Sequence, residues 1–110
     1  MMRRVVVTGL GMVTPLASNV EETWERLLDG QSGAGPITHF DASEQACQIA
    51  AECTPVLEPD ILPKKERRRT DRSVLLALKA AEEAVADAGL VLESAEAERS
   101  GVAIGSGIGG

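Results

Sequence analysis

The sequence has very few aromatic residues and cysteines, and each shortage excludes a class of protein. Trp24 and Phe40 are its only aromatic side chains, so it lacks the aromatic platforms on which single-stranded nucleic acids stack. The two cysteines, Cys47 and Cys53, are too few for a disulfide framework, and their spacing relative to the single histidine, His39, matches no zinc-binding pattern. We therefore predict two buried or half-buried free thiols and no metal site.

Positive charge and long apolar runs are also scarce. The formal net charge is −6, which argues against general binding to nucleic acids or membrane surfaces. No run approaches the roughly 18 apolar residues that a membrane helix needs, and the apolar stretch after the first four residues is too short for a secretory signal. With 44% hydrophobic and 25% charged residues, the chain is predicted to be globular, at most one domain, and cytoplasmic.

The order of apolar and capping residues predicts strands and helices in one chain. Residues 3–8 and 100–104 are rich in β-branched or small apolar side chains and are predicted to be buried strands. Residues 18–28 are predicted to form a helix that either Ser18 or Asn19 caps and Gly30 ends, and an alanine-rich helix from Asp71 to Gly89 is expected to pack closely against a neighbour. Residues 31–63 are predicted to be irregular, with one short strand around residues 48–53.

A glycine-rich loop follows the second predicted strand. Residues 105–110 satisfy the G-x-G-x-x-G spacing, in which backbone amides and a helix N-terminus hold a pyrophosphate. The following helix and the acidic residue of that fingerprint are missing, and tight turns are the other interpretation. A truncated dinucleotide enzyme, which would bind a nicotinamide cofactor, stays an alternative, and the sequence looks cut within a larger architecture.

Positive charge is concentrated in residues 64–72, which we call the basic segment. It has six basic and two acidic residues, so it carries +4 while the remaining residues sum to −10. Such a segment is either the solvated start of a helix or a surface for one specific anionic partner with carboxylates or phosphate. Its basic residues are Lys64, Lys65, Arg67, Arg68, Arg69 and Arg72.

No complete active site can be assembled from these residues alone. His39 has no cysteine or serine nucleophile motif near it, which favours a structural role, and no Ser-His-Asp or Cys-His arrangement can be built. We therefore assign no catalytic residue.

Five spaced blocks of the sequence match one known pattern: residues 5–15 (VVVTGLGMVTP), 24–33 (WERLLDGQSG), 40–41 (FD), 64–72 (KKERRRTDR) and 101–110 (GVAIGSGIGG). Together they resemble one family, the β-ketoacyl-acyl-carrier-protein synthases, which are the condensing enzymes of fatty-acid and polyketide synthesis. The likeness is closest to the type II elongating (synthase II) branch, and modular polyketide ketosynthases share parts of the pattern less well. One departure is Ala17, where that branch commonly has glycine; alanine would be costly there if the turn required a positive φ.

The resemblance implies a thiolase-like α/β fold with α/β/α layers, in a homodimer, of which residues 1–110 would be an incomplete first part of the N-terminal half. It implies an acyltransferase, a 3-oxoacyl-[acyl-carrier-protein] synthase, that condenses an acyl thioester with malonyl-acyl carrier protein by decarboxylative Claisen chemistry. The nucleophilic cysteine, two histidines and a lysine would all follow Gly110, so Cys47, Cys53 and His39 take none of those roles. We expect the segment alone to be inactive and to fold poorly, because its strands would expose apolar edges.

The resemblance also implies two roles for residues within the chain. Ile108 matches a residue that lines the acyl-chain pocket, where side-chain bulk limits chain length. The phosphopantetheine arm belongs to the acyl carrier protein, so the chain needs no cofactor of its own. The alternatives are a non-catalytic carrier-protein-binding module and a polyketide ketosynthase fragment. The positions that match the docking site for the acidic acyl carrier protein are Lys65, Arg68 and Arg69, to which Lys64 and Arg67 add charge.

Overall fold

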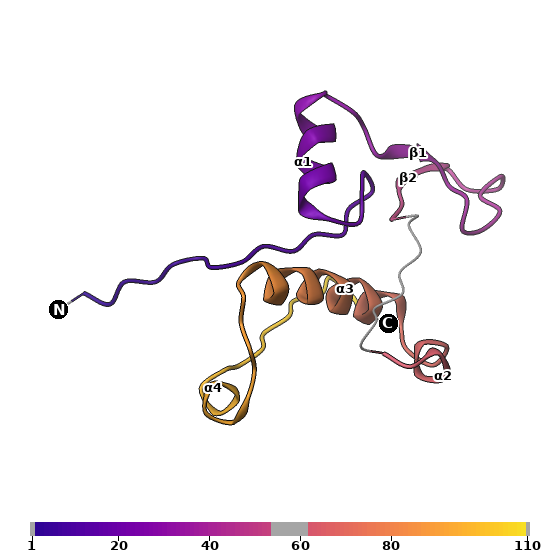
Figure 1. The fold of residues 1–110 in the computed structure, drawn as a ribbon. Coiled ribbons are helices and arrows are strands. Elements are labelled where there is room, and N and C mark those ends of the chain that lie inside the picture. Colours follow the sequence, from indigo (N-terminus) through magenta and orange to yellow (C-terminus); the bar gives the residue numbers. More distant parts are fainter. Residues whose placement is uncertain (1, 54–61, 110) are drawn as a thin grey trace. The chain divides into compact units, whose positions relative to one another are not determined.

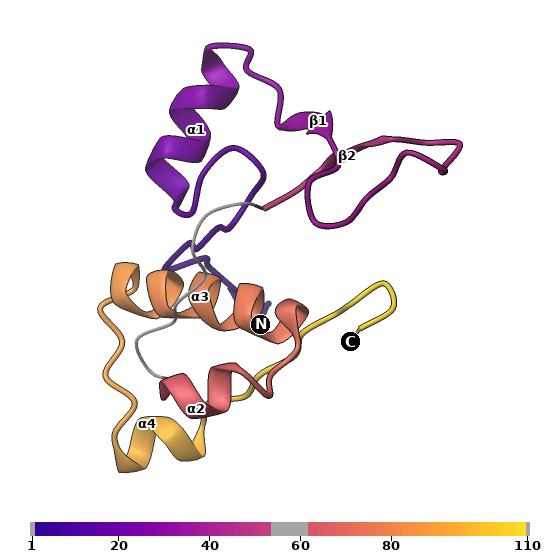
Figure 2. The same ribbon diagram turned by 90° about the vertical axis from the view of Figure 1, so that its right-hand side faces the viewer.

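The computed structural model describes residues 2–53 and 62–109, and within them the chain forms four helices and two short strands (Figures 1 and 2). Residues 12–56 make one compact unit, and residues 1–11 with 57–110 make a second. The elements are α1 (Val20–Leu28), β1 (Ala34–Pro36), β2 (Ile49–Ala51), α2 (Lys64–Arg67), α3 (Arg72–Asp87) and α4 (Ser94–Glu98). Residues 54–61, part of the segment predicted to be irregular, lie outside the described residues.

Helix α1 confirms the helix predicted over residues 18–28 and decides between its two candidate caps. The Asn19 side chain accepts a hydrogen bond from the Glu22 backbone N–H at 2.8 Å, so the helix begins after Asn19 rather than after Ser18. Gly30 has a φ of +70°, the left-handed conformation that ends a helix.

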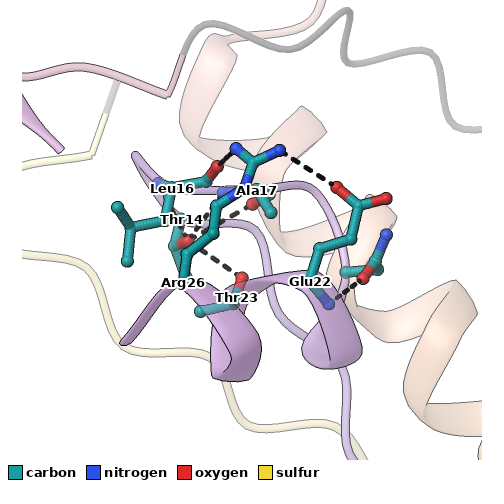
Figure 3. A network of polar contacts seen from close by, with 7 residues as sticks. Thr14, Leu16, Ala17, Glu22, Thr23 and Arg26 are labelled. Atoms are coloured by element: carbon teal, nitrogen blue, oxygen red, sulfur yellow. Dashed lines mark hydrogen bonds and ion pairs between the residues drawn. The ribbon is translucent and has the colours of Figure 1, made fainter. Parts of the chain in front are cut away.

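The turn before α1 is held by a network centred on Thr14 (Figure 3). The Thr14 hydroxyl oxygen accepts hydrogen bonds from the backbone N–H groups of Leu16 and Ala17, at 3.1 and 3.2 Å, and lies 3.0 Å from the hydroxyl of Thr23. Arg26 donates to the Leu16 carbonyl, which ties the turn to the helix. Ala17 is 3% exposed, and no described residue other than glycine has a positive φ. The conformational cost considered for alanine in this turn therefore does not arise.

Strands β1 and β2 form an antiparallel pair in which Ala34 faces Ala51 and Pro36 faces Ile49. Strand β2 confirms the short strand predicted around residues 48–53. Strand β1 was not predicted, because its sequence, Ala-Gly-Pro, has low β-propensity and the pairing alone defines it.

Helix α3 confirms the alanine-rich helix, and Gly89 follows it with a φ of +61°. The neighbour expected from its alanines is the segment around Gly9 and Gly11. A Cβ atom added to Gly11 would lie 1.8 Å from the Ala80 carbonyl oxygen, so only glycine permits this approach of the two backbones.

The strands predicted at residues 3–8 and 100–104 are not strands in this structure. A strand requires a hydrogen-bonded neighbour, and among the described residues only β1 and β2 pair. The apolar side chains of both segments are exposed, with Val5 at 91% and Val102 at 88%. The two-stranded sheet does not by itself form the predicted α/β/α layers.

Candidate functional site

The basic segment occupies α2 and the turn that connects it to α3. Helix α2 is a single turn that follows Pro63, and the chain changes direction after it (Figure 2). Arg67 is half-buried, whereas the side chains of the other basic residues face solvent. The exposed members are Lys64, Lys65, Arg68, Arg69 and Arg72.

Four of these exposed cations have no acidic partner in the described part of the chain. No described carboxylate lies within salt-bridge distance of them. An unpaired exposed cation keeps its full field toward solvent, so these groups can attract an approaching anionic surface. The four are Lys64, Lys65, Arg68 and Arg69.

Backbone hydrogen bonds hold the turn that carries Arg68 and Arg69. The Glu66 carbonyl oxygen accepts from the Arg69 N–H at 2.9 Å and from the Thr70 hydroxyl at 2.8 Å. Sequence reasoning identified the charges of this segment but missed the bond from Thr70. A threonine four residues after a helical carbonyl is the only signal that pointed to it.

The structure does not place Ile108 in a pocket. Its side chain is 101% exposed, in the glycine-rich loop of residues 105–109. No helix begins among the described residues of this loop. The role of Ile108 stays a prediction.

His39 lies beside Glu52, in a cluster that closes the β1–β2 hairpin. The Glu52 carboxylate accepts hydrogen bonds from the Thr38 hydroxyl at 2.7 Å and from the His39 backbone N–H at 3.2 Å. The His39 Nδ1 atom is 3.5 Å from the same carboxylate. The hydrogen bond from the Thr38 hydroxyl is the main cause that lowers the pKa of Glu52, and burial opposes it. These contacts fit the structural role predicted for His39.

The prediction for the cysteines is half right. Cys53 is half-buried, but Cys47 is exposed, because it lies in the long loop of the hairpin, where its thiol donates to the Ile49 carbonyl at 3.4 Å. Over residues 2–53 and 62–109, no three metal-binding side chains cluster. No described helix is both long and apolar enough to cross a membrane.

Comparisons with known proteins point to one family. The family model "Beta-ketoacyl synthase, N-terminal domain" matches residues 2–110. The protein named 3-oxoacyl-[acyl-carrier-protein] synthase 2 of Coxiella burnetii is 50% identical over 108 residues, and its namesake from Synechocystis sp. is 44% identical; each match covers 98% of this chain and 26% of the relative. The chain thus spans about a quarter of the length of the curated relatives it matches.

A solved structure extends the likeness to the fold. The structure of the ishigamide ketosynthase/chain length factor superposes with a TM-score of 0.70 at 38% identity, covering 84% of this chain and 23% of that chain. The family model matches residues 2–110 and the fold likeness covers most of the chain, which therefore belongs to the family of β-ketoacyl synthase N-terminal domains.

Proposed function

We propose that the protein containing this chain is a 3-oxoacyl-[acyl-carrier-protein] synthase of fatty-acid elongation, and that the basic segment docks the acyl carrier protein. The observation that carries the docking role is the set of exposed cations without described acidic partners, on a protein that is otherwise acidic. Relatives at 42–50% identity bear the name 3-oxoacyl-[acyl-carrier-protein] synthase 2, which favours fatty-acid elongation over the polyketide alternative.

In the proposed reaction, an acyl group passes from the carrier-protein thiol to a cysteine of the enzyme, and a thioester forms there. Malonyl-carrier protein then loses carbon dioxide, and the resulting carbanion attacks the acyl thioester carbon. A carbon–carbon bond forms, the cysteine thiolate leaves, and the product is longer by two carbons. In the family pattern the groups for these steps follow Gly110, so this chain contributes docking rather than chemistry.

The thiolase-like α/β/α fold, the homodimer and the cytoplasmic location belong to the same proposal. Each is supported by family membership and by the likeness to a ketosynthase structure. The phosphopantetheine arm would come with the carrier protein, so the enzyme would hold no cofactor of its own.

Ile108 is proposed to line the acyl pocket of the complete enzyme. Its support is the match to the family motif in residues 101–110. A branched apolar side chain flanked by glycines can limit the depth of a narrow slot, because its bulk is fixed while the neighbouring backbone stays close.

The proposed docking role depends on long-range electrostatic attraction. At low ionic strength of about 10 mM the Debye length is about 30 Å, whereas at about 150 mM it is about 8 Å. Clustered cations therefore steer an acidic partner from several ångströms away, mainly through the association rate, and salt weakens the effect. A pair of opposite charges in contact at the surface adds only about 0.2–1 kcal/mol.

The experiment compares carrier-linked and small substrates in the full-length protein. We expect the double charge reversal Arg68→Glu, Arg69→Glu to raise KM for acyl-carrier protein on the order of tenfold or more, through lost attraction and new repulsion. Turnover of an acyl-pantetheine thioester, which lacks the carrier protein, should stay unchanged. The matched control is Arg3→Glu, Arg4→Glu, an adjacent exposed pair outside the basic segment.

Three results would reject parts of the proposal. Equal effects of the two double reversals would show that net charge, not the basic segment, governs binding. An unchanged KM for acyl-carrier protein would remove the docking role. Carrier-protein binding without any condensation would instead establish the non-catalytic binding module.

A further inference from the structure

The turn between α2 and α3 is held by a hydrogen bond from an uncharged side chain, that of Thr70. In a continuous α-helix, the Glu66 carbonyl oxygen would accept the backbone N–H of residue 70. Here the Thr70 N–H bonds to the Arg67 carbonyl at 3.3 Å, and the Thr70 hydroxyl donates to the Glu66 oxygen at 2.8 Å. The hydroxyl therefore replaces a backbone donor at the point where the chain turns.

Two arginines of the basic segment lie within the turn that this bond closes. Arg68 and Arg69 lie between Glu66 and Thr70 in the chain, so the bond closes a loop that contains both. Both side chains are exposed, and the Arg69 N–H bonds to the same Glu66 oxygen at 2.9 Å. The Glu66 carbonyl group thus accepts two of the hydrogen bonds that hold the backbone of both arginines.

We propose that Thr70 is a positioning residue, whose hydroxyl holds the turn between α2 and α3 so that Arg68 and Arg69 meet the carrier protein in a fixed arrangement. This inference rests on the proposed function, because it concerns the same docking surface. Without the bond the cations remain, but the turn has more conformations, and binding must then select one of them. The entropy lost in that selection lowers affinity.

The test uses variants that separate the hydroxyl from the shape of the side chain. Thr70→Val removes the hydroxyl at nearly constant shape, and Thr70→Ser keeps it. Ser100 offers a matched control, because its hydroxyl donates to the Glu96 carbonyl at 2.7 Å in the same pattern at the end of α4, outside the basic segment. The Kd of holo-acyl carrier protein is measured for each full-length variant by calorimetry.

We expect Thr70→Val to bind the carrier protein roughly two- to tenfold more weakly, the effect of one hydrogen bond. Thr70→Ser and Ser100→Ala should bind within about twofold of the parent. The salt dependence of Kd should be unchanged in Thr70→Val, because every cation is retained, but reduced in Arg68→Gln. Amide hydrogen exchange at residues 68–70 should be faster in Thr70→Val. Thr70→Ala is a second hydroxyl deletion for use if the valine variant does not fold.

The outcomes separate this inference from the function on which it rests. A parent that does not bind the carrier protein would reject the proposed function. A parent that binds, together with a Thr70→Val variant of equal affinity, would overturn the positioning role alone. An equal loss of affinity in Ser100→Ala or in Thr70→Ser would also overturn it, because both variants keep a hydroxyl at position 70.

Discussion

Replacing Gly11 with alanine tests the close approach of residues 9–11 to α3. A Cβ atom at Gly11 would lie 1.8 Å from the Ala80 carbonyl oxygen, and one at Gly9 would lie 2.2 Å from the Ala84 carbonyl oxygen. Ordinary contacts between non-bonded heavy atoms begin at about 3.5 Å. Because both obstructing atoms belong to the α3 backbone, no rotamer change relieves the overlap, and the two segments must move apart.

The energetic cost has two parts. Overpacking of a tight contact costs about 1–3 kcal/mol, and more where the backbone is the obstacle. Separation also weakens the hydrogen bond from the Leu10 backbone N–H to the Asp87 carboxylate, now 2.9 Å long, which adds about 1 kcal/mol. We therefore expect Gly11→Ala to lower the free energy of unfolding by about 3 kcal/mol and Gly9→Ala to lower it by slightly less.

The assay is denaturant unfolding of the full-length protein, followed by circular dichroism. Gly101→Ala is the matched control, since an added Cβ there meets nothing within 4 Å and Gly101 has no positive φ. It should change stability by less than about 0.5 kcal/mol. If Gly11→Ala were as stable as Gly101→Ala, the close approach of residues 9–11 to α3 would be wrong.

Two further predictions concern the unit of residues 12–56. Asn19→Ala should destabilise the protein by about 1 kcal/mol, since the side chain caps α1, whereas Ser18→Ala should have little effect; equal thermal shifts would contradict the assigned cap. The lowered pKa of Glu52 means that its ionised form stabilises the fold. That stabilisation is complete above the ordinary value of 4.5 and is lost as pH falls through the lower folded-state pKa. Glu52→Gln should therefore be less stable than the parent at neutral pH. Between neutral and acidic pH it should lose less stability than the parent, as measured by thermal unfolding. A variant with the parent's pH profile would refute the role of Glu52.

Helices α1 and α3 were predictable because their signals are local, whereas the short helices α2 and α4 were not predicted. The cap at Asn19, the left-handed Gly30 and the alanine spacing of α3 each act within one or two turns of the chain. The same reasoning reached the short strand β2. It did not reach β1, whose three residues are extended only because another segment pairs with them.

Features that depend on distant residues were predicted in part. The alanines of α3 indicated a close neighbour, but only the structure identifies that neighbour as Gly9 and Gly11. The apolar runs at residues 3–8 and 100–104 have strand-like composition. Composition indicates a preference for the strand conformation, but it does not identify the segment that would pair with the strand through hydrogen bonds.

The candidate site was also predicted only in part. Charge is a property of residue type, so the basic segment follows from the sequence without any coordinates, and an anionic partner is one of the two interpretations that its charge allows. The arrangement of those charges depends on how one turn is closed, and the Thr70 hydroxyl that closes it on Glu66 carries no charge, so the charge pattern does not reveal it. In the proposed docking role, attraction of the partner is shared among several cations. The proposed positioning of the arginines depends in part on the neutral side chain of Thr70, so variants at Thr70 should separate attraction from positioning where variants at the arginines cannot.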